Sequence, residues 1–534
     1  MADASDSTPA PPAAPWTPQF NPWLIAVVVA MAAFMEVLDT SIANVALPHI
    51  AGDLGASNDQ STWVLTSYLV SNAIVLPISG WLAGMFGRKR FFMLCISLFT
   101  LSSLLCGAAP SLSVLILVRV MQGAGGGGLQ PMAQAILADT FPPQKRGMAF
   151  ALYGITAVIA PTIGPTLGGW ITDNYSWRWI FYVNLPVGIL ALFLVSRMVE
   201  DPPYLSRLRG AGVRLDYIGI GLLAVGVGAL QVLLDKGQED DWFGSQFITT
   251  LAIVAGLCLV TLVIWEWFQK APIVDVRLFK GFNFAIANLM MFSLGILLFG
   301  SLVMMPLFLQ TLLGYTAEKA GLVLSASGIV LLIEMPVVGQ LTTWFPVKYI
   351  IGFGWVALAL GMYDSAKHLD LLISFGSAAW LRVAQAAGMG FLFVPITMAG
   401  YIGVAPEKGN SVAGIVNFMR NIGSSVGTSI VTTLLARRAQ FHQSVLSFHT
   451  SGYDPIFRGQ LAGLARQLTH SGATAPDARV QALGRIYGSL QLQAQTLSYI
   501  DTFMVLAIGA GIMFLLAFIV RRNDPSGGGE VAVG

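Results

Sequence analysis

Long apolar runs, separated by short polar segments, recur from one end of the chain to the other. A run of about 18 or more apolar residues is long enough to cross a bilayer as a helix. We therefore expect an all-α, multi-pass membrane protein. The pattern predicts fourteen membrane-spanning helices, over residues 23–47, 62–84, 91–109, 112–138, 149–172, 177–197, 215–235, 246–268, 283–312, 320–343, 349–364, 376–401, 411–436 and 498–520.

Basic residues are distributed unevenly among the loops. If the N-terminus is cytoplasmic, the loops on that side hold 16 Lys and Arg residues, whereas the short loops on the other side hold four. Basic loops favour the cytoplasmic side of a membrane, so we expect both termini there. The polar segment 437–497 then lies outside, is too long to count in this rule, and could form short helices.

The composition agrees with this class of protein. Hydrophobic residues make up 55% of the chain, charged residues only 10%, and the mean hydropathy is +0.71. A soluble protein carries about 25% charged residues. The Pro-, Ala- and Ser-rich residues 1–22 are predicted to form a disordered cytoplasmic tail, and residues 521–534 a glycine-rich one. The three cysteines lie inside apolar runs, so we expect neither a disulfide framework nor a metal site.

Two pairs of segments show that the chain is internally duplicated. RVMQGAGGGGLQP, residues 119–131, resembles RVAQAAGMGFLFVP, residues 382–395, and LPISGWL resembles MPVVGQL about 260 residues later. We predict an N-terminal six-helix half over residues 23–197, two inserted helices over 198–282, and a C-terminal half over 283–520 that includes the outside segment. Two related halves with a site between them at mid-membrane are typical of transporters.

The segment GAGGGG, residues 123–128, also satisfies the pattern G-x-G-x-x-G. A dinucleotide site needs a strand before this pattern and a helix after it, but here it lies within a predicted membrane helix. Close helix packing through small residues explains it better. Because the chain has no P-loop, we expect no ATP site, and transport would have to use an ion gradient. We also expect no cofactor and no nucleic-acid partner.

Two acids, Glu36 and Asp39, fall inside the first apolar run. They are about 60° apart around a helix, which places them on one face with Thr40 and Ala43, and Asn44 lies at its edge. An ionised group at mid-membrane costs about 3 kcal/mol or more, so such residues face the protein interior or a water-filled cavity. A buried carboxylate can take up and release a proton, and the pair is a candidate for proton coupling. The alternative is a structural contact.

Arg119, in the fourth predicted helix, is the expected partner of Asp39. A proton on the acid would release the arginine, which would give an element with two states. The alternative is a permanent ion pair. Gln122, one helical turn further on, and Asn44 are candidates for substrate contact or packing, as are Arg382 and Arg420 in the C-terminal half.

The fifth predicted helix contains APTIGPTLGGW, which is dense in helix-breaking residues. Proline removes a helical hydrogen bond and glycine removes side-chain bulk, so we expect a kinked, closely packed helix that acts as a hinge and seal between the halves. Packing alone is the alternative. The residues concerned are Pro161, Gly164, Pro165, Gly168 and Gly169.

Together these segments resemble those of the fourteen-helix drug:proton antiporters of the major facilitator superfamily, and most of all their EmrB-type subunits. The similar segments are LDTSIANVALP, TWVLTSY, GWLAGMFGRKR, RVMQGAGGGG, GPTLGGW, LDKGQEDDWFGS, PIVDVRLFK and RRAQFHQ. The resemblance implies that Asp39 and Arg119 belong to the proton-coupling apparatus and that GPTLGGW marks an antiporter. It also implies a bacterial inner-membrane location, a periplasmic adaptor (EmrA-type) and an outer-membrane channel (TolC-type).

Two positions depart from this resemblance. Gly84 stands where the loop after the second helix usually has an aspartate that latches a cytoplasmic gate. We expect Arg88 and Asp139 to take over that latch, with Gly80 and Gly87 beside them. The second departure is Glu334, which stands where an apolar residue is expected. It is a candidate for a second proton site or for contact with cationic drugs, or it is structurally paired with Arg382 or Arg420.

The sequence thus predicts a proton-driven exporter of hydrophobic toxic compounds, that is, multidrug efflux and antibiotic resistance, and not an enzyme. Expected substrates are amphipathic drugs, uncouplers, fatty acids and bile salts. The alternatives are a dedicated exporter of one metabolite, fatty acid or siderophore, and a receptor or scaffold that transports nothing.

Overall fold

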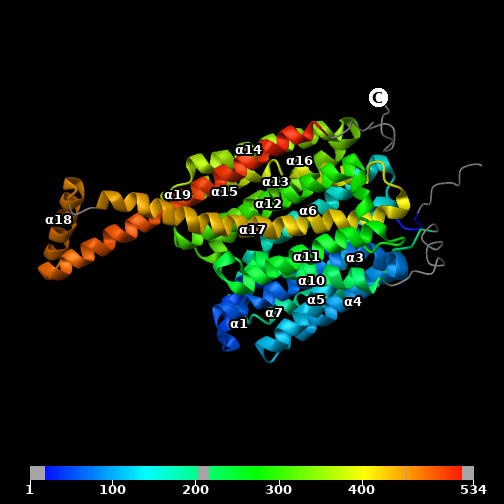
Figure 1. The fold of residues 1–534 in the computed structure, drawn as a ribbon, viewed down its shortest axis with the longest axis horizontal. Coiled ribbons are helices and arrows are strands. Elements are labelled where there is room, and N and C mark those ends of the chain that lie inside the picture. The colour runs from blue at the N-terminus through cyan, green and yellow to red at the C-terminus, as the bar shows by residue number, and fades with distance from the viewer. Residues whose placement is uncertain (1–17, 203–215, 451–452, 520–534) are drawn as a thin grey trace, which may run out of the picture.

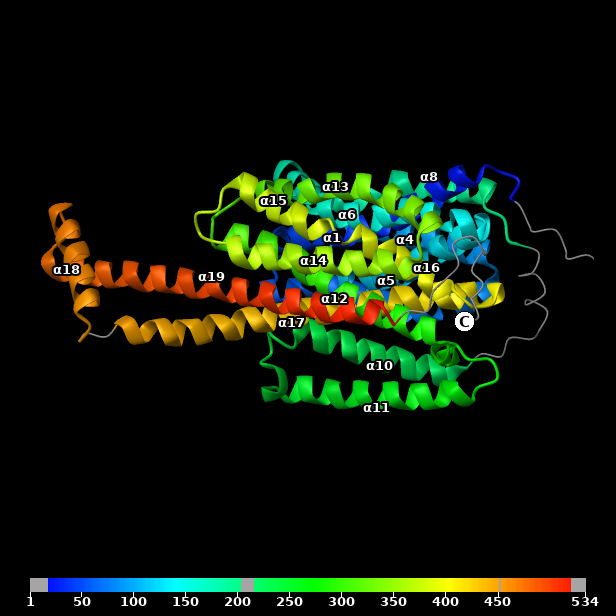
Figure 2. The same ribbon diagram turned by 90° about the horizontal axis from the view of Figure 1, so that it is seen from above.

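The computed structural model describes residues 18–202, 216–450 and 453–519, and in these ranges every regular element is a helix. Most of the predicted tail 1–22, the whole tail 521–534 and the three basic residues Arg207, Arg209 and Arg214 lie outside the described residues. The helices run side by side in one elongated bundle (Figures 1 and 2).

The described chain begins with the helices of the N-terminal half and continues with the inserted pair. The N-terminal half contains α1 (Pro22–Asp53), α2 (Asn58–Ser61), α3 (Trp63–Phe86), α4 (Arg88–Gly107), α5 (Leu112–Thr140), η1 (Pro143–Lys145), α6 (Arg146–Asn174), α7 (Trp179–Tyr182) and α8 (Asn184–Met198). The insertion contains α10 (Tyr217–Lys236), η2 (Trp242–Gly244), α11 (Gln246–Phe268) and η3 (Val276–Lys280).

The C-terminal half follows with longer helices. It contains α12 (Phe282–Thr311), α13 (Ala317–Trp344), α14 (Val347–His368), α15 (Phe375–Ala386), α16 (Gly390–Tyr401), η4 (Pro406–Lys408), α17 (Gly409–Ser447), η5 (Phe448–Thr450), α18 (Pro455–His470) and α19 (Ala475–Ala517). Polar caps start several of them: the side chains of Ser111, Thr316 and Thr474 accept backbone N–H groups at the starts of α5, α13 and α19.

Thirteen helical spans in the described residues are long and apolar enough to cross a membrane. The predicted span 411–436 is not among them, because α17 carries more polar residues than the others. It nevertheless packs against α12, α3 and α19 along the bundle. Two predicted spans are interrupted. Residues 177–197 divide into α7 and α8, and residues 376–401 divide into α15 and α16 with a break at Ala387–Met389.

The prediction of short helices in the outside segment 437–497 is wrong for most of its length. Instead, α17 and α19 continue beyond the bundle, and α18 lies across their ends (Figures 1 and 2). Small apolar side chains, among them Leu468, Ala478 and Ala482, pack α18 against α19. We call the parts of α17 and α19 outside the bundle, with α18, the extension. The bundle has an extension end and, opposite it, a terminal end, where both described chain ends lie.

The glycine run of α5 is a packing surface. A Cβ on Gly127 would lie 2.7 Å from the backbone oxygen of Asn72 in α3, and one on Gly125 would lie 2.7 Å from the backbone nitrogen of Phe99 in α4. Because glycines line both faces, α5 fits between two helices at backbone distance. The helical setting excludes a dinucleotide loop here.

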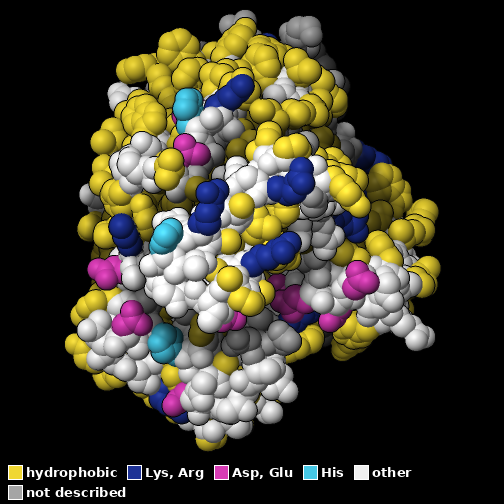
Figure 3. Space-filling view, turned by 90° about the vertical axis from the view of Figure 1, so that its left-hand side faces the viewer, with side chains coloured by type: hydrophobic (Ala, Val, Ile, Leu, Met, Phe, Trp, Pro, Cys, Tyr) yellow, Lys and Arg dark blue, Asp and Glu magenta, His cyan; other side chains and the backbone are white. Residues whose placement is uncertain are grey.

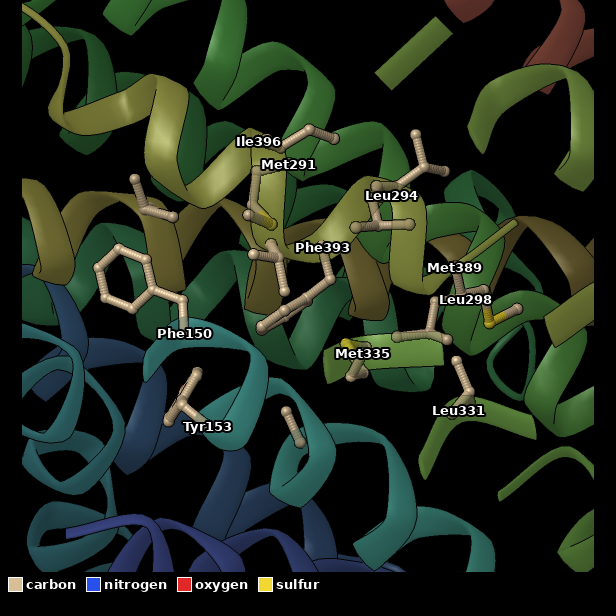
Figure 4. Close-up of a cluster of buried hydrophobic side chains, with 14 of the residues drawn as sticks. Phe150, Tyr153, Met291, Leu294, Leu298, Leu331, Met335, Met389, Phe393 and Ile396 are labelled. Carbon is tan, nitrogen blue, oxygen red and sulfur yellow. The ribbon is translucent and has the colours of Figure 1, made fainter. Parts of the chain in front are cut away.

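The two halves meet along α6 with α13 and along α3 with α17, and α6 also packs against α1. Buried apolar side chains fill the interface near its middle (Figure 4). Tyr153 of α6 stacks on Phe393 of α16, with ring centroids 6.0 Å apart, and Met335 of α13 lies beside them. The inserted helix α11 contacts mainly α10, and its outer face is exposed and apolar, as expected for a lipid-facing helix.

Candidate functional site

Asp39 and Arg119 form an ion pair inside the N-terminal half, as predicted. Nη1 of Arg119 lies 2.6 Å from Oδ2 of Asp39, and the two side chains are 0% and 1% exposed. Asp39 lies in α1 and Arg119 lies in α5, and both helices are mostly apolar around these residues. Removing one member of a buried pair typically costs 3–5 kcal/mol, because the other charge is left uncompensated.

Neutral polar groups surround the Asp39 carboxylate. Gln122 and Asn184 donate to its Oδ1 over 3.0 and 2.7 Å. Both side chains also donate to the hydroxyl of Ser103 on α4. The Arg119 guanidinium donates to Gln122 over 2.7 Å, whereas its Nη2 has no hydrogen-bond partner. Four helices thus hold one carboxylate whose charge is balanced by a single arginine.

Glu36 does not share the surroundings of Asp39, which corrects the expectation of one common face. The 60° between the two positions is enough to separate them: Asp39 faces α5, and Glu36 faces a cavity between the halves. Glu36 accepts hydrogen bonds from Tyr68 over 3.1 Å, from Asn72 over 3.0 Å, and from Gln130.

Tyr68 connects the two acids. Its hydroxyl donates to Glu36, and the guanidinium carbon of Arg119 lies 4.3 Å from the centre of its ring. An arginine over an aromatic ring gains about 1–2 kcal/mol when both are buried. Tyr68 therefore contacts Arg119 through its ring and Glu36 through its hydroxyl group.

The cavity has a volume of about 450 Å³ and reaches from mid-bundle toward the extension end. Both apolar and polar side chains line its wall, which suits amphipathic ligands. The lining comes from both halves and from the inserted helix α10: Glu36, Val37, Thr40, Ser41, Asn44, Leu65, Tyr68, Leu69, Asn72, Gln130, Ala157, Pro161, Gln231, Leu234, Asp235, Gln238, Glu239, Leu298, Phe299, Leu302, Val303, Phe393, Arg420, Asn421, Ser424, Ser425, Thr428, Ser429 and Thr432.

Gln130 joins the halves at the floor of the cavity. Its amide nitrogen donates to Glu36, and its amide oxygen accepts from Arg420 of α17 and from the hydroxyl of Tyr153, the latter over 3.0 Å. Arg420 also lies over Phe393, 5.5 Å from the ring centre. The side chain of Gln130 therefore links Glu36 in the N-terminal half to Arg420 in the C-terminal half.

The halves close tightly at the terminal end. A Cβ on Gly80 of α3 would lie 2.8 Å from the backbone of Ser411 in α17, and one on Gly339 of α13 would lie 2.9 Å from the backbone of Met148 in α6. At Gly84, by contrast, an added Cβ would meet nothing within 4 Å. At the terminal end the two halves are thus in contact at backbone distance.

Arg88 pairs with Asp139, and it also donates to the backbone oxygen of Ala135 over 3.1 Å; their part in a cytoplasmic latch stays a prediction. Both residues belong to the N-terminal half, so the pair ties α4 to α5. Gly87, just before α4, has φ +86°, a conformation that favours glycine.

The proline- and glycine-rich motif lies where α6 passes α1. Ser41 donates to the backbone oxygen of Pro161 over 3.2 Å, and a Cβ on Gly168 would lie 3.1 Å from Ile42. Gly164 lies against Ser41 in the same way. The backbone oxygen of Gly169 accepts from Thr172 over 3.0 Å, and α6 remains one helix through Pro161 and Pro165.

Glu334 is paired with neither Arg382 nor Arg420, so that alternative is wrong. Its side chain is 9% exposed and neither carboxylate oxygen has a hydrogen bond of normal geometry. The carboxylate lies against Gly390, at the start of α16, where the backbone N–H groups of Gly390 and Phe391 are its nearest donors. Arg382 instead donates to Gln385 over 2.8 Å and to Ser301 over 3.2 Å.

Several site residues were not predicted from the sequence: Tyr68, Asn72, Ser103, Gln130, Tyr153, Asn184 and the cavity face of α10. Gln130 had a readable signal, because it is an amide inside the apolar helix α5. Among the described residues no group of three or more His, Cys, Asp or Glu side chains could hold a metal ion.

Comparison with known proteins agrees with this architecture. The sequence model of the Major Facilitator Superfamily matches residues 29–428. The multidrug export protein EmrB of Haemophilus influenzae is 40% identical over 81% of this chain and 84% of its own length. EmrB of Escherichia coli is 36% identical over 95% and 96% of the two chains, and the fatty acid resistance protein FarB of Neisseria gonorrhoeae is 36% identical over 94% and 96%.

Solved structures with little sequence similarity share the fold. The proton:xylose symporter XylE superposes with a TM-score of 0.60 at 13% identity, covering 94% of this chain and 97% of XylE. With the family match and the relatives above, these findings show that the chain belongs to the Major Facilitator Superfamily and is an EmrB-type member of it.

Proposed function

We propose that this protein exports hydrophobic and amphipathic toxic compounds in exchange for protons. The observation that carries the proposal is the connection between the cavity and the buried ion pair: Glu36 in the cavity wall, Tyr68 beside it, and the Asp39–Arg119 pair behind the tyrosine. The names of the EmrB relatives, multidrug export proteins, support the substrate class.

The proposed coupling runs through Arg119. A proton on Asp39 cancels the charge that holds the guanidinium, which then rests on the Tyr68 ring and on neutral partners alone. The tyrosine shifts, Glu36 loses a hydrogen-bond donor, and the Gln130 amide passes the change to Arg420 in the other half. The halves then rock about α6, whose glycines and prolines permit its close contact with α1.

We infer that the extension end faces outward, since the basic loops favour cytoplasmic termini. The structure then represents an outward-facing state, in which a substrate leaves and a proton enters. We propose the inner membrane of a bacterium as the location. The extension is a suitable docking site for a periplasmic adaptor that leads to an outer-membrane channel (Figure 3), since charged and apolar side chains mix on that face.

Glu334 is proposed as a second proton-binding group. An acid that is buried in a membrane helix and has no basic partner among the described residues is a candidate for carrying protons. Glu334→Gln should therefore reduce the number of protons released per exported molecule. Unchanged stoichiometry with full resistance to every compound tested would reduce Glu334 to a structural role.

Proton release from acidified inverted vesicles on addition of amphipathic compounds tests the proposal. The wild-type protein should release protons in proportion to substrate, and Asp39→Asn at matched expression should release at least ten-fold less. If both respond alike, Asp39 is not the coupling acid. If the wild type shows no substrate-dependent release, alone or reconstituted with an adaptor, a receptor or scaffold replaces the transporter as the function.

A further inference from the structure

We propose that the inserted helix α10 forms a wall of the substrate cavity, and that Asp235 on this wall gives the transporter a preference for cationic amphiphiles. The inference deepens the proposed export function and rests on it. It assigns a specificity-determining residue to the inserted helices α10 and α11. These helices lie between the two duplicated halves, so Asp235 has no counterpart in the repeat.

The polar positions of α10 form one stripe. Gln231 and Asp235 lie four residues apart on one face of α10, with Leu234 beside them, and Gln238 and Glu239 continue the stripe in the turn that follows the end of the helix at Lys236. The rest of α10 is nearly devoid of polar residues. All five stripe residues line the cavity. A polar stripe confined to the cavity face is what a wall of an aqueous site requires.

The stripe is joined to both halves of the transporter. Thr66 of α3 donates to the Asp235 carboxylate, and Gln231 exchanges hydrogen bonds of 2.8 and 3.1 Å with the Ser425 hydroxyl of α17. Further along, Trp242 donates to Thr433 of α17 over 3.1 Å. Since α3 and α17 come from opposite halves, α10 fills the seam between them at the extension end, where the cavity would otherwise face lipid.

Charge compensation singles out Asp235 among the acids in the wall. Glu36 faces Arg420 across Gln130, and Glu239 is paired with Lys236 at 2.6 Å. The Lys236 ammonium also donates to Thr62 and makes no ion pair with its neighbour Asp235. Asp235 is exposed, and among the described residues no basic group lies within ion-pair distance of it. Its charge is therefore directed into the cavity.

A negative charge in the wall of a cavity attracts a cation and repels an anion of the same size. Tetraphenylphosphonium and tetraphenylborate are such a pair, because they share shape and apolar surface and differ in sign. Binding of each to the purified full-length protein, measured by equilibrium dialysis without a membrane or a gradient, isolates the effect of Asp235 from proton coupling.

We expect the wild type to bind tetraphenylphosphonium more tightly than tetraphenylborate. Asp235→Asn should weaken phosphonium binding about ten-fold and leave borate binding unchanged or stronger, which corresponds to about 1.4 kcal/mol of lost charge attraction. Asp240→Asn, in the same segment but outside the cavity lining, is the matched control and should behave as the wild type.

Gln238→Lys is the second variant, because it places a positive charge near Asp235 and cancels the local negative charge without removing the bond between Thr66 and Asp235. It should abolish the preference for the cationic probe. An unchanged ratio of the two affinities in both variants overturns the assignment of Asp235, even if substrate-driven proton release in vesicles persists. The opposite result, charge-selective binding without any substrate-driven proton release, would support the α10 wall and refute the export function.

Discussion

In each half of the molecule, an arginine and a glutamine one helical turn apart lie buried in the same setting. Arg119 donates to Gln122 over 2.7 Å, and Gln122 reaches the hydroxyl of Ser103. Its counterpart Arg382 donates to Gln385 over 2.8 Å, and Gln385 reaches the hydroxyl of Ser365. The pairs of positions are 262 to 263 residues apart in sequence, as the duplication requires.

The two halves differ in the position of the buried acid relative to this arginine. The N-terminal arginine has Asp39 at 2.6 Å, whereas the same atom of Arg382 meets the hydroxyl of Ser301 at 3.2 Å. The C-terminal acid is Glu334, which lies against Gly390, just as its counterpart Val75 lies against Gly127. The polar scaffold is thus present in both halves, whereas of these two arginines only Arg119 has an acid within ion-pair distance among the described residues. We infer that the scaffold supports the fold and that the acid carries the coupling.

The strongest way to break this comparison is to neutralise the arginine in each half separately. Arg119→Gln should lower substrate-driven proton release at least ten-fold, because Asp39 loses the only charge that balances it. Arg382→Gln should lower it less than three-fold, since its partners are neutral. Proton release from inverted vesicles at matched expression measures both. Equal losses would mean that the two arginines do the same work.

The closed terminal end is where the halves should behave alike. Gly80→Ala and Gly339→Ala each push a methyl group against the backbone of the opposite half, so each should reduce export about ten-fold by obstructing closure. Gly84→Ala, where the methyl group meets open space, is the control and should export normally. Drug accumulation in whole cells is a sufficient measurement. An effect of only one of the two variants would show that the gate is asymmetric.

Tyr68→Phe tests whether the tyrosine hydroxyl couples the Asp39–Arg119 pair to Glu36. The ring under Arg119 remains, but the 3.1 Å hydrogen bond to Glu36 is lost, at a cost of about 1 kcal/mol. We expect proton release per substrate to fall about five-fold while substrate binding persists. Tyr499→Phe in α19, outside the cavity lining, serves as the control. Full coupling in Tyr68→Phe would exclude the hydroxyl from the path between the acids.

The smallest expected effect is on stability. Glu334→Val makes the C-terminal half resemble the N-terminal half at this position, and removing an unpartnered buried carboxyl group should stabilise the protein by about 1–3 kcal/mol. The reverse exchange, Val75→Glu, should destabilise it. Thermal unfolding in detergent would show the opposite shifts. A lower unfolding temperature for Glu334→Val would indicate that Glu334 has a partner after all.

The fold and the ion pair were predictable because strong local signals carry them. Apolar runs show where the helices are. An unpaired charge inside a membrane is costly, so a buried acid and a buried arginine are expected to pair. The floor of the cavity was not predictable from the same reasoning. Gln130 is neutral, costs little by itself, and meets Arg420 only because the halves fold onto each other. The contact between Gln130 and Arg420 cannot be read from a single sequence.

The role of α10 was hidden for a different reason. Its polar stripe is legible at helical spacing, but a stripe near the end of a membrane helix equally suits a helix that ends in the lipid headgroups. Only the packing of α10 across α3 and α17 turns the stripe toward a cavity. Similarly, the separate surroundings of Glu36 and Asp39 depend on a 60° difference that matters only once their neighbours are in place.

The uninterrupted course of α17 has a mechanical consequence. The same 39-residue helix carries Ser429 in the cavity wall and Ser447 near its outer end, which are about 27 Å apart at 1.5 Å per residue. A tilt of about 10° at the wall would sweep the outer end through about 5 Å. A small tilt of α17 at the cavity wall would therefore move its outer end by several ångströms. Through this helix, a change at the cavity would be transmitted to a protein bound at the extension.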